Sequence, residues 1–284
     1  MRRRLSNNRL TSKYIQEADP ILSHPLLTFK KMINNACIMP DERLDHVNEN
    51  ITLIQKKNGL TFGTDALLLA AFIRSHPTKT ALDFGAGSGI LSFLCAARHK
   101  FRRIGAVELQ LEFCDLIERN IVLNHFEKEV VCINEDIRLL HQNKLGFEAD
   151  VIFSNPPYMR ADSGKTNLHT IKTIARHEIY GDIYDFCLAT ARNLKFGGLF
   201  YAVYRPDRMA ELFSAMRSAA LEPKRLTMVY PDSVSPPALL LTEAKKGANP
   251  GVKNTKPLIL YEDITHAKYT EDFQYIHDNG NFKE

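Results

Sequence analysis

The 284-residue chain has no tryptophan, few cysteines and no long hydrophobic run. Its longest apolar stretch, residues 66–73, is far shorter than the roughly 20 residues that a helix needs to cross a bilayer. The five cysteines are scattered without a CxxC pair, which favours buried, reduced thiols over a disulfide framework or a zinc site. They are Cys37, Cys95, Cys114, Cys132 and Cys187. The ten histidines form neither an HxH nor an HExxH pattern, so metal catalysis has no support.

Charge is weak overall and uneven along the chain. A net charge of +4 and a pI near 8.7 are compatible with an anionic partner, although they do not by themselves indicate one. Residues 1–40 carry seven Lys and Arg against two acidic residues and form a basic arm. We expect this arm either to be a solvated, disordered N-terminus or to contact RNA. The main domain should then span residues 41–262, with a C-terminal tail at residues 263–284.

The middle of the chain predicts a parallel sheet covered by helices. From residue 80 on, short β-type runs alternate with amphipathic helices, the pattern of a doubly wound α/β fold. We expect its strands at residues 81–84, 104–108, 130–134, 151–154 and 199–204. Further strand-like runs follow Pro223, at residues 226–230, 238–242 and 258–261. Because no helix separates them, they should pair antiparallel at the sheet edge.

A small β-hairpin and a helix are expected just before this sheet. The β-type runs 51–55 and 60–62 flank Asn58 and Gly59, a dipeptide typical of tight hairpin turns. Thr64 and Asp65 then offer N-cap side chains for an apolar helix at residues 66–74. The main domain therefore begins with a β-hairpin extension.

The most informative feature is a proline-rich turn after the strand at residues 151–154. Residues 155–158 read Asn-Pro-Pro-Tyr, and the two prolines restrict the backbone and remove two N–H donors. The Asn155 side-chain oxygen and the Pro156 carbonyl remain as acceptors, beside the stacking surface of the Tyr158 ring. Taken alone, such a turn is an ordinary strand ending. Together with a second motif upstream, the turn becomes a candidate binding site for a planar NH2 group.

That second motif is a glycine-rich loop after the first parallel strand, where doubly wound folds bind nucleotide-like ligands. Residues 83–89 read Asp-Phe-Gly-Ala-Gly-Ser-Gly. A dinucleotide fingerprint would need glycine where Ile90 stands, and a phosphate loop would need Gly-Lys-Ser/Thr, so the sequence favours neither. Glu108 ends the second strand, where it can accept hydrogen bonds from ribose hydroxyls. Asp136 ends the third strand, either near an adenine ring or as an ordinary loop carboxylate.

The order and spacing of these motifs resemble those of the class I S-adenosylmethionine-dependent methyltransferases that modify amino groups, over roughly residues 45–262. Within that class, three further runs are similar to the bacterial tRNA1(Val) adenine-N6-methyltransferase family. They are residues 63–71, Ser154 before the turn, and residues 175–178, which read Ala-Arg-His-Glu. That family methylates the exocyclic amine of an adenine beside the anticodon. Residues 1–40 lie outside the resemblance.

The resemblance implies a Rossmann-like, mostly parallel seven-stranded sheet and S-adenosyl-L-methionine as cofactor, without a metal. Asp83 and Gly85 would line its methionine part, Glu108 its ribose, and Asp136 with Ile137 its adenine. Thr64 and Asp65 would close the cofactor site, in addition to capping a helix. The full set of cofactor-binding residues that it implies is Thr64, Asp65, Asp83, Gly85, Gly87, Gly89, Glu108, Leu109, Asp136, Ile137 and Asn155.

The chemistry of the turn agrees with this class. An exocyclic aromatic amine is a weak nucleophile because its lone pair is conjugated into the ring. If Asn155 and Pro156 accept its two N–H bonds, the nitrogen becomes pyramidal and its lone pair can attack an electrophilic methyl group without a prior general base. Tyr158 would stack on a base that has left its neighbours. The candidate catalytic residues are therefore Asn155, Pro156 and Tyr158.

A basic stretch after the turn is expected to bind the RNA substrate. It contains Arg160, Lys165, Lys172 and Arg176. Loops at the carboxyl edge of such a sheet are where a substrate arrives, so we favour phosphate contact over a merely solvated loop. A tRNA-modifying enzyme with free thiols is expected in the cytoplasm.

Other functions use the same motifs. A protein methyltransferase acting on the glutamine amide of release factors has the same turn, but such enzymes carry a helical N-terminal domain, whereas a hairpin is expected here. Ribosomal-RNA and DNA amino-methyltransferases differ only in substrate. A non-catalytic RNA-binding protein on a degenerate methyltransferase scaffold is disfavoured because Asp83, Glu108 and Asn155 are all intact.

Overall fold

The computed structural model describes residues 38–57, 63–146, 148–156 and 181–283. Residues 1–37, which make up nearly all of the basic arm, are a unit separate from residues 38–284 and lie outside the described residues. Within the described part of the chain, no helix is long and apolar enough to cross a membrane. Its four cysteines are free thiols, and three of them are buried.

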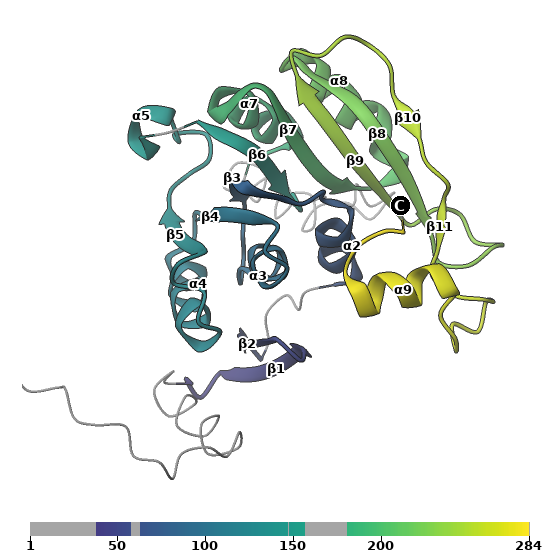
Figure 1. Cartoon of the computed structure of the whole chain (residues 1–284), viewed down its shortest axis with the longest axis horizontal. Coiled ribbons are helices and arrows are strands. Elements are labelled where there is room, and N and C mark those ends of the chain that lie inside the picture. Colours follow the sequence, from purple (N-terminus) through teal and green to yellow (C-terminus); the bar gives the residue numbers. More distant parts are fainter. Residues whose placement is uncertain (1–37, 58–62, 147, 157–180, 284) are drawn as a thin grey trace, which may run out of the picture. The chain divides into compact units, whose positions relative to one another are not determined.

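Among the described residues, a nine-stranded sheet forms the centre of the unit at residues 38–284 (Figure 1). Its strands are β3 (His76–Phe84), β4 (Phe101–Glu108), β5 (Val130–Asn134), β6 (Ala149–Ser154), β7 (Leu194–Tyr204), β8 (Leu221–Tyr230), β9 (Leu239–Lys246), β10 (Lys253–Asn254) and β11 (Leu258–Ile259). The order β10-β8-β9-β7-β6-β3-β4-β5 holds eight of them, and β11 pairs with β8. The five strands predicted as parallel are all present and parallel, from β5 across to β7.

The side of the sheet formed by the last strands of the chain, β8 to β11, differs from the prediction in two ways. Strands β7, β9 and β8 pair antiparallel, as expected. The run at residues 258–261 was expected to pair antiparallel as well, but β11 pairs parallel with β8, and so does the two-residue strand β10. In the part of the chain that the structure describes, the sheet therefore has nine strands instead of the predicted seven. The antiparallel course of β9 makes this possible, because its last residue, Lys246, lies opposite Leu221 at the start of β8, and residues 247–252 then lead into β10 and β11 beside β8.

Alternating side chains of the strands enter two hydrophobic clusters, one on each face of the sheet. Ala81 belongs to the cluster with helices α2 (Thr64–Phe72), α3 (Ile90–Ala97) and α4 (Leu111–Leu123), whereas its neighbour Leu82 belongs to the other. That second cluster contains α7 (Ile183–Asn193) and α8 (Met209–Ser218). Figure 1 shows the two groups of helices on opposite faces. Burial on both faces follows from this period of two.

An antiparallel hairpin precedes the sheet, as predicted, although its first strand is an unexpected one. Strand β2 (Ile51–Lys56) pairs with β1 (Glu42–Asn48), and Asn48 closes the turn by accepting a hydrogen bond from the Asn50 N–H at 2.9 Å. The predicted turn at residues 58–59 and the run 60–62 lie outside the described residues. The N-cap of α2 is Gly63, without a side-chain cap from any described residue, so the helix starts two residues earlier than expected.

Helix α4 binds this hairpin through two asparagines one turn apart. The buried Asn120 side chain accepts from the Ile54 N–H at 2.7 Å and donates to the Ile54 carbonyl at 3.1 Å. Asn124 makes the same pair of bonds with Thr52, at 2.9 and 2.8 Å. The two side chains thus satisfy the edge of β2 as a neighbouring strand would.

The C-terminal segment, expected to be a tail, contains helix α9 (Glu271–Asn279). Phe273 and Ile276 of this helix are buried in the cluster that also contains α2. Thr270 caps its first turn by accepting from the Phe273 N–H at 3.2 Å. Two shorter elements complete the described fold, helix α5 (Gln142–Leu145) and the 3-10 helix η1 (Pro206–Arg208).

Candidate active site

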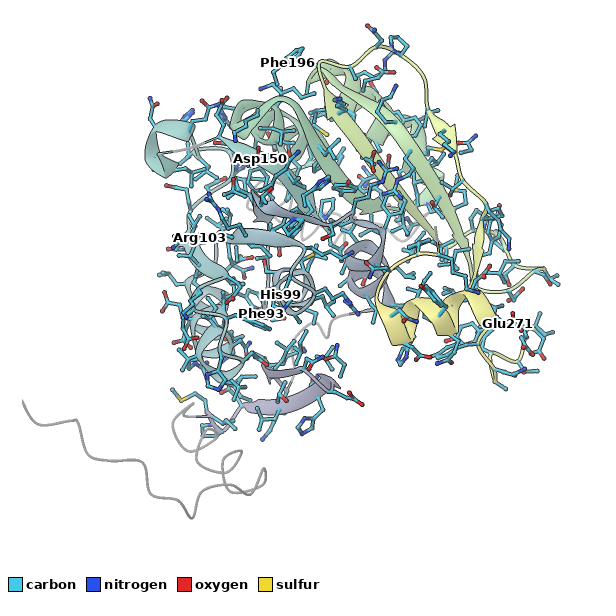
Figure 2. All side chains as sticks on the ribbon, viewed as in Figure 1. Phe93, His99, Arg103, Asp150, Phe196 and Glu271 are labelled. Carbon is cyan, nitrogen blue, oxygen red and sulfur yellow. The ribbon has the colours of Figure 1, made fainter. Side chains whose placement is uncertain are left out.

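The glycine-rich loop connects the end of β3 to helix α3. Gly85, Gly87 and Gly89 all have positive φ values, of 71, 56 and 86°, which glycine adopts without the strain of a side chain. At Gly89 a Cβ atom would also lie 2.6 Å from the Phe93 ring, a side chain of α3 that Figure 2 labels. The loop therefore depends on glycine both for its backbone turn and for the close packing of the helix that follows.

Asp83 lies at the carboxyl end of β3 and is 1% exposed. Its carboxyl group accepts a 2.7 Å hydrogen bond from the Ser92 hydroxyl on α3. Burial raises the pKa of Asp83 to about 7, and the nearby Glu108 charge acts in the same direction. A cation bound beside this carboxyl would favour its ionised form, so the site is suited to an ammonium group.

Glu108 ends the adjacent strand β4 and is held by backbone donors. Its Oε2 atom accepts from the Gly87 N–H at 2.8 Å, and its Oε1 atom accepts from the Gln110 N–H at 2.9 Å. The Gln110 side-chain amide also donates to Oε1, at 3.4 Å. A carboxylate has about four lone-pair positions, so one on Oε2 stays available for a hydroxyl group, and a second is freed if the long Gln110 bond gives way. Asn134, which the sequence reasoning missed, donates to the Glu108 and Leu109 carbonyls at 3.0 Å each. The sequence could have indicated Asn134, because it is the last residue of the third parallel strand.

Asp136 follows β5 and is bound by its neighbour Arg138. The Arg138 backbone N–H and guanidinium donate to both carboxylate oxygens, at 2.6 to 3.0 Å. These bonds lower the pKa of Asp136. The arrangement resembles the ordinary loop carboxylate that the sequence left as an alternative, and an adenine ring would compete with Arg138 for the same oxygens. Ile137 beside it is buried.

The described part of the proline-rich turn lies at the end of β6, next to β3. Asp83 of β3 is paired with Phe153 of β6, two residues before Asn155. Ser154 is fully buried, and its hydroxyl donates to the Phe84 carbonyl at 2.7 Å. Because the two strands are parallel neighbours, the turn and the glycine-rich loop leave the sheet from the same edge.

Asn155 is half-buried and its side chain reaches helix α2. Its Nδ2 atom donates to the Asp65 Oδ2 atom at 3.0 Å. Asp65 was predicted from the sequence as a cofactor-site residue, and the structure brings it to the predicted catalytic asparagine. Thr64 is exposed at the start of α2, and Pro156 is buried. The other predicted residues of this region lie outside the described residues, namely Tyr158, Arg160, Lys165, Lys172 and Arg176.

The structure thus gathers most of the predicted residues that it describes at the carboxyl edges of β3, β4, β5 and β6. Among the described residues, no group of three or more His, Cys, Asp or Glu side chains is arranged to hold a metal ion. The Phe186 ring of α7 also reaches this edge, since a Cβ atom at Gly85 would lie 3.5 Å from it.

Comparison with known proteins assigns the class of enzyme. Residues 56–178 match the model of the methyltransferase small domain family. A tRNA1(Val) (adenine(37)-N6)-methyltransferase of Parabacteroides distasonis is 26% identical over 228 residues, which cover 80% of this chain and 93% of the relative. The enzyme of the same name from Vibrio cholerae is 34% identical over 122 residues, 43% of this chain and 48% of the relative. The chain thus spans nearly all of one relative and about half of the other.

Solved structures share the fold. A protein of Agrobacterium tumefaciens described as a predicted O-methyltransferase has a TM-score of 0.62 and 22% identity, covering 78% of this chain and 98% of that one. TYW2 of M. jannaschii in complex with AdoMet has a TM-score of 0.50 and 15% identity, covering 73% of this chain and 86% of that one. The predicted doubly wound fold and the predicted class, an S-adenosylmethionine-dependent methyltransferase, are confirmed.

The described residues fit this cofactor. A Cβ atom at Gly87 would meet nothing within 4 Å, so open space adjoins the loop. The fixed Glu108 carboxylate keeps a lone-pair position for a ribose hydroxyl, and the Asp83 carboxyl suits the ammonium of an amino acid. Which of the predicted residues contact the cofactor stays a prediction.

Proposed function

We propose that this S-adenosylmethionine-dependent methyltransferase modifies the exocyclic N6 amine of an adenine in tRNA. The observation that carries the proposal is the position of Asn155, beside the glycine-rich loop and with its amide group held by Asp65. The names of the relatives from Parabacteroides distasonis and Vibrio cholerae support the finer assignment, an adenine in the anticodon loop of tRNA1(Val). With a tRNA substrate, we expect the reaction to take place in the cytoplasm.

The chain's own residues would activate the amine by accepting its hydrogens. The Asn155 side-chain oxygen and the Pro156 carbonyl would each accept one N–H bond of the NH2 group, which favours a pyramidal nitrogen with a free lone pair. The bound cofactor supplies an electrophilic methyl group on a sulfonium. The nitrogen would bond to the methyl carbon as the carbon–sulfur bond breaks, and the sulfur would leave as a neutral thioether. The methylated amine, then positively charged, would release one proton to water, so no general base is needed before the transfer. Tyr158 would stack on the extruded base.

RNA binding is assigned to the basic stretch after the turn. Arg160, Lys165, Lys172 and Arg176 would contact phosphates around the extruded adenine. Neutralised phosphates give affinity without sequence information, so recognition of one tRNA would depend on the shape of its loop and on the base pocket.

A glutamine-amide methyltransferase is the main alternative, because an amide NH2 is also planar and conjugated. The described start of the main domain is a β-hairpin docked on α4, which does not match the helical N-terminal domain of those enzymes. The nucleic-acid alternatives, ribosomal RNA and DNA, share the base and the chemistry, so the substrate must be found by assay.

The direct test is to incubate the protein with cofactor labelled on its methyl group and with separate pools of tRNA, ribosomal RNA, DNA and release-factor protein. Digestion of the labelled pool should give N6-methyladenosine from tRNA. Label in glutamine, or in another nucleic acid only, would contradict the proposal. Asn155→Ala should abolish transfer and leave cofactor affinity nearly unchanged, whereas Asn143→Ala on the exposed face of α5 should leave both as in the wild type.

A further inference from the structure

Asp65 and Asn155 are separated by 90 residues in sequence and meet at the carboxyl edge of the sheet. The bond runs from the Asn155 Nδ2 atom to the Asp65 Oδ2 atom, at 3.0 Å. Both side chains are half-buried. A hydrogen bond with a charged partner is roughly twice as strong as one between neutral groups. This contact can therefore fix the side-chain conformation of Asn155.

The chemistry of the pair decides which way the Asn155 amide points. A carboxylate accepts and does not donate, so the NH2 group of Asn155 must face Asp65 and the Oδ1 atom must face away from it. A half-turn of the amide would place its oxygen against the carboxylate and its NH2 group toward the substrate. In that orientation two donors would oppose each other, and the substrate amine would lose an acceptor.

The Asp65 carboxylate is itself held in place by helix α2. Its Oδ1 atom accepts a 2.8 Å hydrogen bond from the Ala66 N–H in the first turn of the helix, where the helix dipole favours negative charge. Gly63 leaves room for this conformation, because a Cβ atom there would lie 2.7 Å from Asp65 Oδ1. One oxygen is thus bound to the helix and the other to the asparagine.

The opposite end of α2 is fixed by two cations. The buried ammonium of Lys100 donates to the Ala70 carbonyl at 2.7 Å and also to the Ile73 carbonyl. The Arg225 guanidinium donates to the Phe72 carbonyl at 2.7 Å. These groups satisfy the last carbonyls of the helix and complement its dipole. Asp65 therefore projects from an element with little freedom to shift.

We propose that Asp65 is a positioning residue for methyl transfer, which sets the orientation of the Asn155 amide so that its oxygen faces the substrate amine. This role rests on the proposed function of Asn155 and differs from a cofactor-binding role for Asp65. In this role Asp65 acts through the Asn155 side chain, to which it is bound. Its loss should therefore lower the rate of transfer at saturating substrate and leave cofactor affinity unchanged.

The test compares Asp65→Asn, Asn155→Asp and the double variant that exchanges the two residues. Asparagine at position 65 keeps only one oxygen, which cannot accept from both the Ala66 N–H and the Asn155 NH2 group as the two Asp65 oxygens do, so kcat should fall about 10- to 100-fold. The dissociation constant of the cofactor and the KM for RNA should change less than about twofold. Asn155→Asp places two carboxylates side by side and should also be slow. Asp278→Asn on the exposed part of α9 is the matched control for loss of one charge and should retain wild-type rates.

The exchange variant separates orientation from stability. With asparagine at position 65 and aspartate at 155, an NH2 group again faces an acceptor and an oxygen again faces the substrate. Its kcat should exceed that of either single variant by about tenfold. A merely structural role for Asp65 would lower the thermal midpoint without such a recovery. If the single variants do not fold, the exchange variant, which restores the bond, carries the test.

Three results would overturn the inference. They are a wild-type kcat for Asp65→Asn, an exchange variant slower than both single variants, and a cofactor affinity at least tenfold weaker in Asp65→Asn with kcat unchanged. All three require a wild-type protein that methylates tRNA. Failure of the wild type to label adenine in tRNA would instead overturn the proposed function, and this inference with it.

Discussion

The backbone N–H of Gly87 donates a 2.8 Å hydrogen bond to the carboxylate of Glu108, which ties the glycine-rich loop after β3 to the end of β4. Gly87 adopts a φ of 56°, so the loop presents this N–H through a backbone conformation that other residues rarely adopt. Glu108 is 5% exposed and its other oxygen is bound by the Gln110 N–H. Both motifs are therefore held in place by hydrogen bonds within the protein itself.

Glu108→Gln should weaken cofactor binding about 10- to 100-fold, as expected for the loss of charge-assisted hydrogen bonds worth about 1.5–3 kcal/mol. The NH2 group of the new glutamine must face either the Gly87 or the Gln110 N–H, so two hydrogen-bond donors would face each other there. Titration calorimetry with S-adenosylmethionine measures the effect, and turnover at saturating cofactor should stay near that of the wild type. Glu118→Gln on the exposed face of α4 is the control. An unchanged affinity would show that Glu108 is only a loop anchor.

Asp83 should make the stability of the protein depend on pH. Burial raises its pKa to about 7, against an ordinary value of 3.8. Between these values the folded state holds a proton that the unfolded state has lost, so this contribution to the free energy of unfolding falls as pH rises from about 4 to 7. The asparagine of Asp83→Asn cannot ionise, so the free energy of unfolding of this variant should not fall in this way between pH 4 and 7. Urea unfolding of both proteins at several pH values measures the difference, which should shift in favour of the variant by the order of a few kcal/mol. A difference that stays constant with pH would contradict the assignment.

Lys100→Met should destabilise the protein by the order of 2 kcal/mol, because methionine leaves the buried carbonyls at the end of α2 without a donor. Burial lowers the pKa of Lys100 to about 8, from an ordinary value of 10.5. Above pH 8 the unfolded state therefore binds more protons, so the wild type should gain stability relative to the variant between about pH 8 and 10.5. Denaturant unfolding across this range checks both statements. A variant as stable as the wild type at every pH would show that the cap is dispensable.

The sheet and the neighbouring motifs were predictable because period-two burial and parallel pairing leave a direct trace in sequence. Ala81 and Leu82 alternate between the two hydrophobic clusters, as expected for a strand covered on both faces. Strands β3 and β6 end at the same edge, so the motifs that follow them had to lie close together. The placement of Asn155 beside the glycine-rich loop follows from these two facts.

Contacts between distant segments left no such trace. Strand β1 contains five charged or polar residues and only two apolar ones, Leu44 and Val47. Its first residue, Glu42, has a carboxylate bound by Arg119 of α4 at 2.7 Å. A charged run of this kind reads as a loop until its partner is known. The bond between Asp65 and Asn155 likewise depends on where α2 lies, and that position is set by Lys100 and Arg225, which hold its far end.

The final prediction concerns RNA binding by the basic stretch after the turn. Each phosphate contact made by a lysine or arginine releases counterions, so binding weakens with salt along a log–log slope of about 0.7 per contact for single strands and 0.9 for duplexes. Charge reversal at both Lys165 and Arg176 should weaken tRNA binding and make that slope shallower by about one to two units. The matched control reverses two exposed lysines away from the carboxyl edge of the sheet. Lys79 lies in the first half of β3, and Lys253 is the first residue of β10. Filter binding at several salt concentrations measures the slopes, and equal slopes for the wild type and the Lys165 and Arg176 variant would place the RNA elsewhere on the protein.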